Sequence, residues 1–253
     1  MIILVIDCET TGLPRKNNAY PSQYWMFDTS RLLEFAYILY DTTTNVKLST
    51  YSNLICPDNF EVKATEIHGI TKYMASTGVD IEELFDHLES IIDNFECIVS
   101  HNIDFDMRIV LSEVYRYNRQ VLYDKLLSKK FLCTMTIGGN AFNDGKYIGL
   151  ESLTIKLGLD SFVAHRALVD AEIALDCLVE MMKLKETNKK IKFTNWKHDI
   201  RKYDKQENPK SAYQNRNYNV YFNKRNFYKS DGCIWCDGDS SNEDMCDECM
   251  TKD

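Results

Sequence analysis

Five ionisable side chains in three short segments constrain the fold and chemistry of this chain more than any other feature. They are Asp7 and Glu9 in VIDCETTG, Asp106 in HNIDFD, and His165 and Asp170 in HRALVDA. Four carboxylates repel one another, so a fold that gathers them in one cleft needs divalent cations between them. Oxygen-rich sites suit Mg²⁺ or Mn²⁺. The ordered set therefore predicts a metal-dependent phosphodiesterase site, as in a nuclease.

Each segment, taken alone, also has an ordinary structural explanation. An Asp-x-Glu pair after a strand is commonly a solvated strand end, and a histidine five residues before an aspartate is commonly part of a helix cap. Asp106 alone is an ordinary acid at a helix N-terminus, where the helix dipole stabilises it. The occurrence of all three segments in this order favours the metal site.

The length and composition favour one main domain inside a cell. The 253 residues suffice for one domain with a full hydrophobic core and a smaller appendage. The apolar run at 2–6 is too short for a signal-peptide core, and no stretch reaches the roughly 20 apolar residues of a membrane span. Five cysteines stand singly in apolar surroundings, as reduced core thiols do: Cys8, Cys56, Cys97, Cys133 and Cys177. We expect an intracellular protein, cytoplasmic or nuclear, that is not secreted and has no membrane partner.

The net charge of −8 is the sum of three zones of different sign. Residues 1–188 carry 17 basic and 27 acidic side chains, residues 189–229 carry 12 and 3, and residues 230–253 carry 1 and 8. A local basic zone is the usual electrostatic form of phosphate-backbone contact. The middle zone is therefore expected to be a linker or a segment that contacts nucleic acid.

Aromatic and basic residues alternate within this middle zone, at 219–229 (NVYFNKRNFYK). Such interleaving suits single-stranded nucleic acid, where stacking contributes about 1–3 kcal/mol per base. The alternative is a strand-turn-strand element that packs on the main domain.

Four cysteines near the C-terminus predict a zinc module. They are spaced as Cys233-x2-Cys236-x9-Cys246-x2-Cys249. Two CxxC pairs place four thiolates at tetrahedral spacing for Zn²⁺, and a closed four-sulfur site is structural. The alternative is a redox or disulfide pair. Because the loop between the pairs is too small to fold alone, we expect metal binding and folding to be coupled.

The strand pattern predicts a sheet whose first strand carries the first acid pair. The apolar, β-branched run at 2–6 ends at Asp7, as a central strand does. The segments 31–40 and 46–55, separated by DTTTN, predict an antiparallel pair, although Glu34 interrupts the apolar pattern of the first.

Helical spacing dominates the rest of the main domain. A helix is predicted over 80–93, a strand over 97–100, and helices from near Asp106, over 150–157 and after His165. Strands followed by alternating helices and strands indicate an α/β fold, in which helices pack on a mixed sheet.

The spacing of the acids suits two-metal chemistry. Asp7 and Glu9 are two residues apart on a strand, so their side chains point to the same face. Two metals roughly 4 Å apart stabilise both the attacking and the leaving oxygen of a displacement at phosphorus. His165 is the candidate general base, because it combines a suitable pKa with proximity to Asp170.

The motifs resemble a known family. VIDCETTGLP, EIHGIT at 66–71, SHNIDFDMRI at 100–109 and HRALVDAEIAL at 165–175 are similar, in order, to motifs of the DnaQ-like DEDDh 3′–5′ exonucleases. That family includes the proofreading subunit of bacterial replicative DNA polymerase and RNA-trimming enzymes. The resemblance covers about residues 1–185 and implies a ribonuclease-H-like fold with a mixed five-stranded sheet flanked by helices.

The resemblance also implies roles for individual residues. Asp7, Glu9 and Asp170 would bind one catalytic Mg²⁺ or Mn²⁺, Asp7 and Asp106 a second, and His165 would be the base. Because the family's acid follows the phenylalanine, Asp106 rather than Asp104 is implied. The tyrosine-base variant is excluded, because position 166 is arginine.

Five further residues are implied to line the pocket for the terminal nucleotides: Thr10, Leu13, His68, Asn102 and Phe105. Alternatives stay open for two of them, because His68 also suits a helix-start cap and Phe105 also suits the core. Ile103 stands where the family has a small residue, and 14–30 is longer than a minimal turn. Both departures concern substrate preference.

We therefore expect an exonuclease domain at 1–188, a basic aromatic-rich segment at 189–230 and an acidic zinc module at 231–253. The expected activity is removal of nucleoside 5′-monophosphates from 3′ ends of single-stranded or frayed DNA or RNA, with a polymerase or another replication or repair protein as a partner. The alternatives are a catalytically silent nucleic-acid or protein adaptor that keeps the fold, and a zinc-organised interaction protein. The choice between DNA and RNA stays open.

Overall fold

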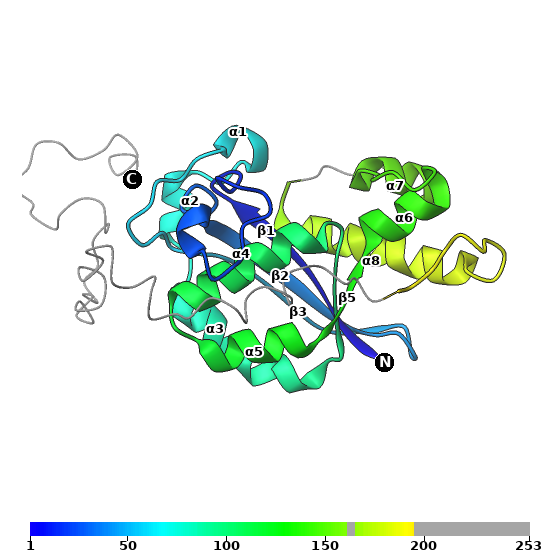
Figure 1. The fold of residues 1–253 in the computed structure, drawn as a ribbon, viewed down its shortest axis with the longest axis horizontal. Coiled ribbons are helices and arrows are strands. Elements are labelled where there is room, and N and C mark those ends of the chain that lie inside the picture. Colours follow the sequence, from blue (N-terminus) through cyan, green and yellow to red (C-terminus); the bar gives the residue numbers. More distant parts are fainter. Residues whose placement is uncertain (161–164, 195–253) are drawn as a thin grey trace, which may run out of the picture. The chain divides into compact units, whose positions relative to one another are not determined.

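A five-stranded mixed sheet is the centre of the computed structural model, which describes residues 1–160 and 165–194 (Figure 1). The strands are β1 (Ile2–Thr10), β2 (Leu32–Asp41), β3 (Val46–Leu54), β4 (Cys97–Ser100) and β5 (Lys130–Cys133). Their order is β3-β2-β1-β4-β5. β2 runs antiparallel to β1 and β3, whereas β4 and β5 run parallel to β1. The prediction of a ribonuclease-H-like mixed sheet is confirmed.

The burial of each strand follows its place in the sheet. β1 and β2 lie at the centre with neighbours on both sides, and nine of the ten residues of β2 are buried. Their near-continuous apolar sequences suit a strand that is covered on both faces. β3 is an edge strand whose first five residues are exposed, and it is correspondingly polar. The predicted pair at 31–40 and 46–55 is confirmed to within a residue at each end.

Three helices cover one face of the sheet (Figure 1). They are α3 (Ile81–Ile91), α4 (Ile103–Arg116) and α5 (Gln120–Ser128), and they bury Leu4, Ile6 and Cys8 of β1. α3 begins where its sequence predicts, because the Asp80 carboxylate accepts a hydrogen bond of 2.8 Å from the Glu82 N–H. α4 begins three residues earlier than predicted, so Asp106 lies inside its first turn rather than at its start.

The other face of β1 is covered by α8 (Ala167–Leu184). Ala171 and Ala174 of this helix pack against Ile3 and Val5, and their small side chains let α8 approach the strand closely. Residues alternate between the faces of a strand, so Asp7 and Glu9 share the face of Ile3 and Val5. The sheet therefore directs this acid pair toward the start of α8.

The helices α6 (Thr134–Phe142) and α7 (Leu150–Leu157) pack beside α8. Gly138 makes this packing possible, because a Cβ there would lie 2.6 Å from Leu153 Cδ1. No element was predicted for α5, β5 and α6. β5 has only four residues, and α6 contains Gly138 and Gly139, which are poor helix formers.

Short elements complete the described chain. They are η1 (Tyr24–Phe27), α1 (Thr65–His68), α2 (Lys72–Ser76) and η2 (Ile92–Asn94). In the described part, no helix is both long and apolar enough to cross a membrane. The predicted zinc module and the aromatic-basic stretch at 219–229 lie outside the described residues, and the domain limits at 188 and 230 stay predictions.

Candidate active site

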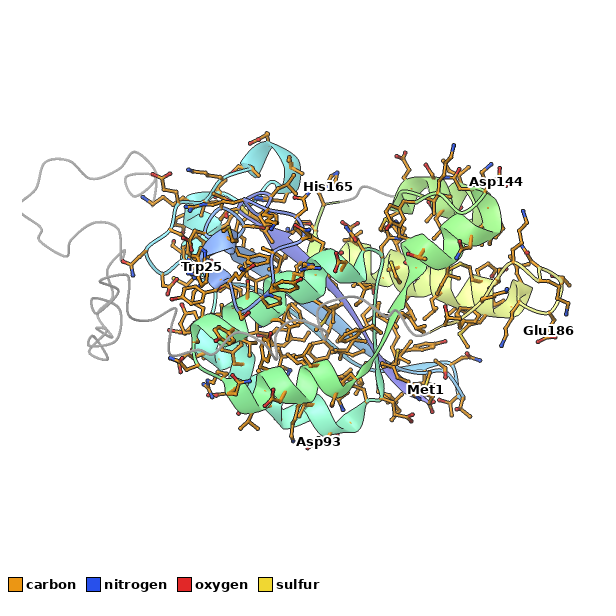
Figure 2. The ribbon with its side chains drawn as sticks, viewed as in Figure 1. Met1, Trp25, Asp93, Asp144, His165 and Glu186 are labelled. Atoms are coloured by element: carbon orange, nitrogen blue, oxygen red, sulfur yellow. The ribbon has the colours of Figure 1, made fainter. Side chains whose placement is uncertain are left out.

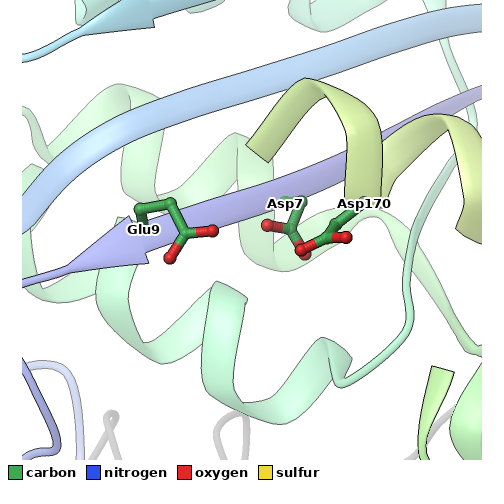
Figure 3. Close-up of side chains that lie close together, drawn as sticks. All are labelled: Asp7, Glu9 and Asp170. Carbon is green, nitrogen blue, oxygen red and sulfur yellow. The ribbon is translucent and has the colours of Figure 1, made fainter. Parts of the chain in front are cut away.

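Three of the predicted carboxylates converge where β1 meets the start of α8. Ligand oxygens of Asp7, Glu9 and Asp170 all lie within 4.8 Å of one another. Figure 3 shows the carboxylates of Asp7 and Asp170 close together and that of Glu9 directed toward them from further along β1. The two-residue spacing on the strand and the first turn of α8 produce this arrangement.

Burial and mutual repulsion oppose the ionisation of these three acids. Burial, followed by the charge of Asp106, holds the pKa of Asp7 well above its usual value. Burial and the charge of Asp170 raise the pKa of Glu9 to about 8, and burial raises the pKa of Asp170. A group of this kind binds either protons or a cation at neutral pH.

The donor atoms fit a hard divalent cation. Asp170 Oδ1 is buried and has no hydrogen-bond partner among the described residues. A buried oxygen without a partner is costly, and a cation beside the three carboxylates would satisfy it. Carboxylate oxygens are the ligands of Mg²⁺ and Mn²⁺, so the residues suit the predicted metal.

Asp106 approaches the same site from α4 but is not part of the group within 4.8 Å. Its carboxylate accepts hydrogen bonds from the Ser100 hydroxyl and from Cys8. Burial is the largest cause that raises its pKa to about 7. Of the neighbouring charges, that of Asp106 raises the pKa of Asp7 the most. Asp106 is therefore close enough to Asp7 for the two carboxylates to repel each other.

His165 lies on the segment that leads into α8, at the surface of the molecule (Figure 2). Its imidazole is exposed and is not part of the group of three carboxylates. Its backbone N–H donates a hydrogen bond of 3.0 Å to Asp170 Oδ2. With a φ of 78°, the residue has a left-handed conformation that non-glycine residues rarely adopt.

Two residues beside the carboxylates, Glu34 and Arg166, were not predicted as part of the site. Glu34 of β2 is only 1% exposed and lies opposite Glu9 in the strand register. It forms an ion pair of 2.7 Å with Arg166. The one sequence signal was the acidic residue in an otherwise apolar strand.

The implied substrate residues separate into two groups. Leu13, Asn102 and Phe105 line one pocket of about 200 Å³ at the surface. The full lining is Leu13, Pro14, Asn17, Phe27, Asn102, Asp104, Phe105 and Arg108. The pocket therefore lies between the start of α4 and the segment that follows β1, which includes the long turn at 14–30.

Thr10 and His68 do not line this pocket. The Thr10 hydroxyl donates to the Gly12 carbonyl, 2.8 Å away. His68 is buried, its Nδ1 accepts from the Ile70 N–H, and its Nε2 donates to the Lys63 carbonyl, both over 2.9 Å. His68 therefore has a local structural role in this structure, at the last residue of α1 rather than at a helix start.

A mixed five-stranded sheet, with paired acids on its first strand and further acids in the first turns of two helices, is typical of a ribonuclease-H-like fold with a carboxylate site. Comparison with known proteins agrees with this class. The model of the exonuclease family RNase_T matches residues 4–178. The chain belongs to this exonuclease family, and its described part is a nuclease domain.

Individual relatives show how far the similarity extends. The PolC-type DNA polymerase III of Thermotoga petrophila is 29% identical over 205 residues, which is 78% of this chain and 13% of that much longer protein. DNA polymerase III subunit epsilon of Aquifex aeolicus is 23% identical over 181 residues, 71% of this chain and 79% of that subunit.

A solved structure shares the fold. The nuclease domain of 3′hExo, described as a DEDDh family member bound to rAMP, matches with a TM-score of 0.57 at 15% identity. The match covers 78% of this chain and 97% of that domain.

Proposed function

We propose that this chain is a metal-dependent 3′–5′ exonuclease, which hydrolyses terminal phosphodiester bonds of single-stranded or frayed nucleic acid and releases nucleoside 5′-monophosphates. The observation that carries the proposal is the convergence of Asp7, Glu9 and Asp170 within 4.8 Å in a member of the exonuclease family. Such a group of acids, in which Asp7 and Glu9 are half-buried and Asp170 is buried, suits phosphoryl chemistry with cations.

The carboxylates divide into two metal positions. Asp7, Glu9 and Asp170 would hold one Mg²⁺ or Mn²⁺, and Asp7 and Asp106 would hold a second. Bound there, the cations would supply Lewis-acid stabilisation of the attacking and leaving oxygens. The Ser100 hydroxyl, which donates to Asp106, keeps that carboxylate oriented and favours its ionised form.

His165 has the role of general base. Its exposed imidazole accepts a proton from the attacking water at a ring nitrogen and releases it to solvent. The hydrogen bond from its backbone N–H to Asp170 leaves the imidazole free for this transfer. An exposed base exchanges protons rapidly, which suits repeated turnover along a strand.

The pocket beside Phe105 receives the terminal nucleotides. Leu13 and Phe105 offer apolar surface for a base, and Asn102 offers amide donors and acceptors. Thr10 holds the backbone of Gly12, next to Leu13, through its hydroxyl. The long turn at 14–30 contributes Pro14, Asn17 and Phe27 to the lining, which supports a role for this turn in substrate preference.

The names of the relatives guide the choice of substrate and partner. Two relatives are named as DNA polymerase III proteins, which favours DNA and a polymerase as partner. The 3′hExo domain was solved with rAMP, which keeps RNA as a substrate to be tested. The module at 231–253 is proposed to bind a structural Zn²⁺. The basic segment at 189–230 is proposed to contact nucleic acid.

A time course of cleavage tests the proposed function. Single-stranded DNA and matched RNA, labelled at the 5′ end, are incubated with Mg²⁺, Mn²⁺ or EDTA, and Asp7→Ala serves as the control. We expect a metal-dependent ladder that shortens from the 3′ end and is absent with Asp7→Ala. Binding without cleavage by the folded wild-type protein would instead favour the silent adaptor.

A further inference from the structure

Glu34 is a buried carboxylate that faces the proposed metal site from β2. It lies opposite Glu9 in the antiparallel register, and directly opposite residues of such a pair project from the same face. Glu34 is only 1% exposed. A fifth acid at this place adds like charge to the carboxylate group, which is unfavourable unless the acid has a compensating role.

Arg166 accounts for both oxygens of Glu34. Arg166 Nε lies 3.2 Å from Oε1 and 3.0 Å from Oε2, and Nη2 lies 2.7 Å from Oε1. This two-pronged contact matches the planar fork of a guanidinium, which lysine cannot reproduce. Since both oxygens are engaged, Glu34 is not a free ligand for a cation.

The same carboxylate caps helix α8. The Ala167 N–H, at the first position of the helix, donates to Glu34 Oε2 over 3.0 Å. The N-cap residue Arg166 makes no side-chain cap of its own. A carboxylate from another strand therefore satisfies the helix N-terminus, where negative charge is favourable.

Arg166 and Ala167, which the Glu34 carboxylate holds, lie between His165 and Asp170 in the sequence. Arg166 follows His165 directly, and its carbonyl accepts a hydrogen bond of 3.0 Å from the Asp170 N–H. The left-handed conformation of His165 is one that persists only when the surroundings impose it. The contacts of Arg166 and Ala167 with β2 impose it from one side, and the hydrogen bond with Asp170 imposes it from the other.

We propose that Glu34 and Arg166 form a positioning pair, which fixes the start of α8. The pair thereby keeps His165 and Asp170 in place beside the proposed metal site. The proposal rests on the proposed function, because the pair has no chemistry of its own.

The test compares Arg166→Gln, Arg166→Lys and Glu34→Gln with wild type in steady-state cleavage of a single-stranded oligonucleotide. Arg166→Gln is expected to lower kcat by about 10- to 100-fold, as loss of a group that orients a metal ligand does. KM should change little, because the pair does not line the pocket at Phe105. Arg166→Lys should regain part of the loss, since it keeps the charge but not the fork. If Arg166→Gln does not fold, a wild-type kcat in Arg166→Lys overturns the proposal.

Arg119→Gln is the matched control. Arg119 also forms ion pairs with several acids, Glu82, Asp86 and Glu89. These acids belong to α3, which lies away from the carboxylate group. Its loss should leave kcat unchanged. Equal losses in Arg119→Gln and Arg166→Gln would overturn the proposal, because they would indicate a general loss of stability.

Titration with Mn²⁺ alone separates this proposal from the proposed function. If wild type does not cleave nucleic acid, the proposed function fails, but weaker Mn²⁺ binding by Arg166→Gln would still support the positioning pair. Wild-type Mn²⁺ affinity in folded Arg166→Gln, together with wild-type kcat where cleavage occurs, would overturn it.

Discussion

The backbone N–H of His165 donates a hydrogen bond to Asp170 Oδ2 over 3.0 Å, so the proposed base and a proposed metal ligand are linked through the main chain. The link does not use the imidazole. A substitution at position 165 can therefore remove the base without removing this contact with Asp170.

Replacement of His165 should separate catalysis from metal binding. His165→Ala is expected to lower kcat by roughly 100-fold or more, because the base is lost, with Mn²⁺ affinity nearly unchanged. His165→Asn is the matched variant, since asparagine tolerates the left-handed backbone. Steady-state kinetics and Mn²⁺ titration of both variants check this prediction. Wild-type turnover in His165→Asn would remove the imidazole from the mechanism.

Removal of metal should make stability depend on pH. The pKa of Glu9 is raised from 4.5 to about 8 and that of Asp106 from 3.8 to about 7, so the folded protein binds protons more tightly than the unfolded chain. The contribution of Glu9 to the free energy of unfolding is therefore constant below about pH 4.5. It falls as the pH rises from about 4.5 to about 8.

Mg²⁺ takes the place of these protons, so it should stabilise the protein more at about pH 8 than at about pH 5.5. The Tm in EDTA and in Mg²⁺ at each pH measures the difference. An equal increase in Tm at both pH values would contradict the assignment of these carboxylates to a cation.

Ser100→Ala should weaken the second metal position. The variant removes the hydroxyl that donates to Asp106, and loss of such an orienting group costs about 10-fold or more in metal affinity or activity. We expect half-maximal activity to require more Mg²⁺, with Ser100→Thr as the conservative control. A Mg²⁺ dependence identical to wild type in Ser100→Ala would show that Asp106 needs no such orientation.

Leu13→Ala should affect substrate binding rather than chemistry. Leu13 is 70% exposed and lines the pocket, so the substitution should change stability by no more than about 0.5 kcal/mol. Loss of a leucine contact with a base should raise KM by about 10-fold at nearly constant kcat. A fall in kcat at constant KM would place Leu13 outside the substrate pocket.

The C-terminal cysteines give an independent prediction. Replacement of Cys233 and Cys236 by serine should abolish bound Zn²⁺, which needs all four thiolates, without loss of cleavage of a short oligonucleotide. Metal analysis and the cleavage assay on the same preparation measure both. Loss of cleavage while the nuclease domain stays folded would instead assign the tail to substrate binding.

Much of this site could be predicted from sequence, because its key residues follow regular elements. The alternation of a strand places Asp7 and Glu9 on one face, and the apolar stripe of a helix places Asp170 beside the sheet. By contrast, the contact between Glu34 and Arg166 joins residues far apart in the chain. The only sequence signal for this contact was one acid, Glu34, in an apolar strand. Arg166 could be recognised as its partner only from the fold.

The inward orientation of His68 shows a second limit. A short motif places a histidine near a site but does not determine which way its ring turns. Here the ring bridges the backbone of Lys63 and Ile70, because the tight turn around α1 leaves polar backbone groups that need partners. The elements α5, β5 and α6 were missed for a related reason, because their positions depend on packing more than on periodicity.

The most direct test of the account is anomalous scattering from crystals of the protein grown with Mn²⁺. We predict a Mn²⁺ peak coordinated by Asp7, Glu9 and Asp170, which disappears in crystals of Asp7→Ala. A well-ordered wild-type structure with Mn²⁺ bound elsewhere, and none at these three carboxylates, would contradict the proposed metal-dependent exonuclease.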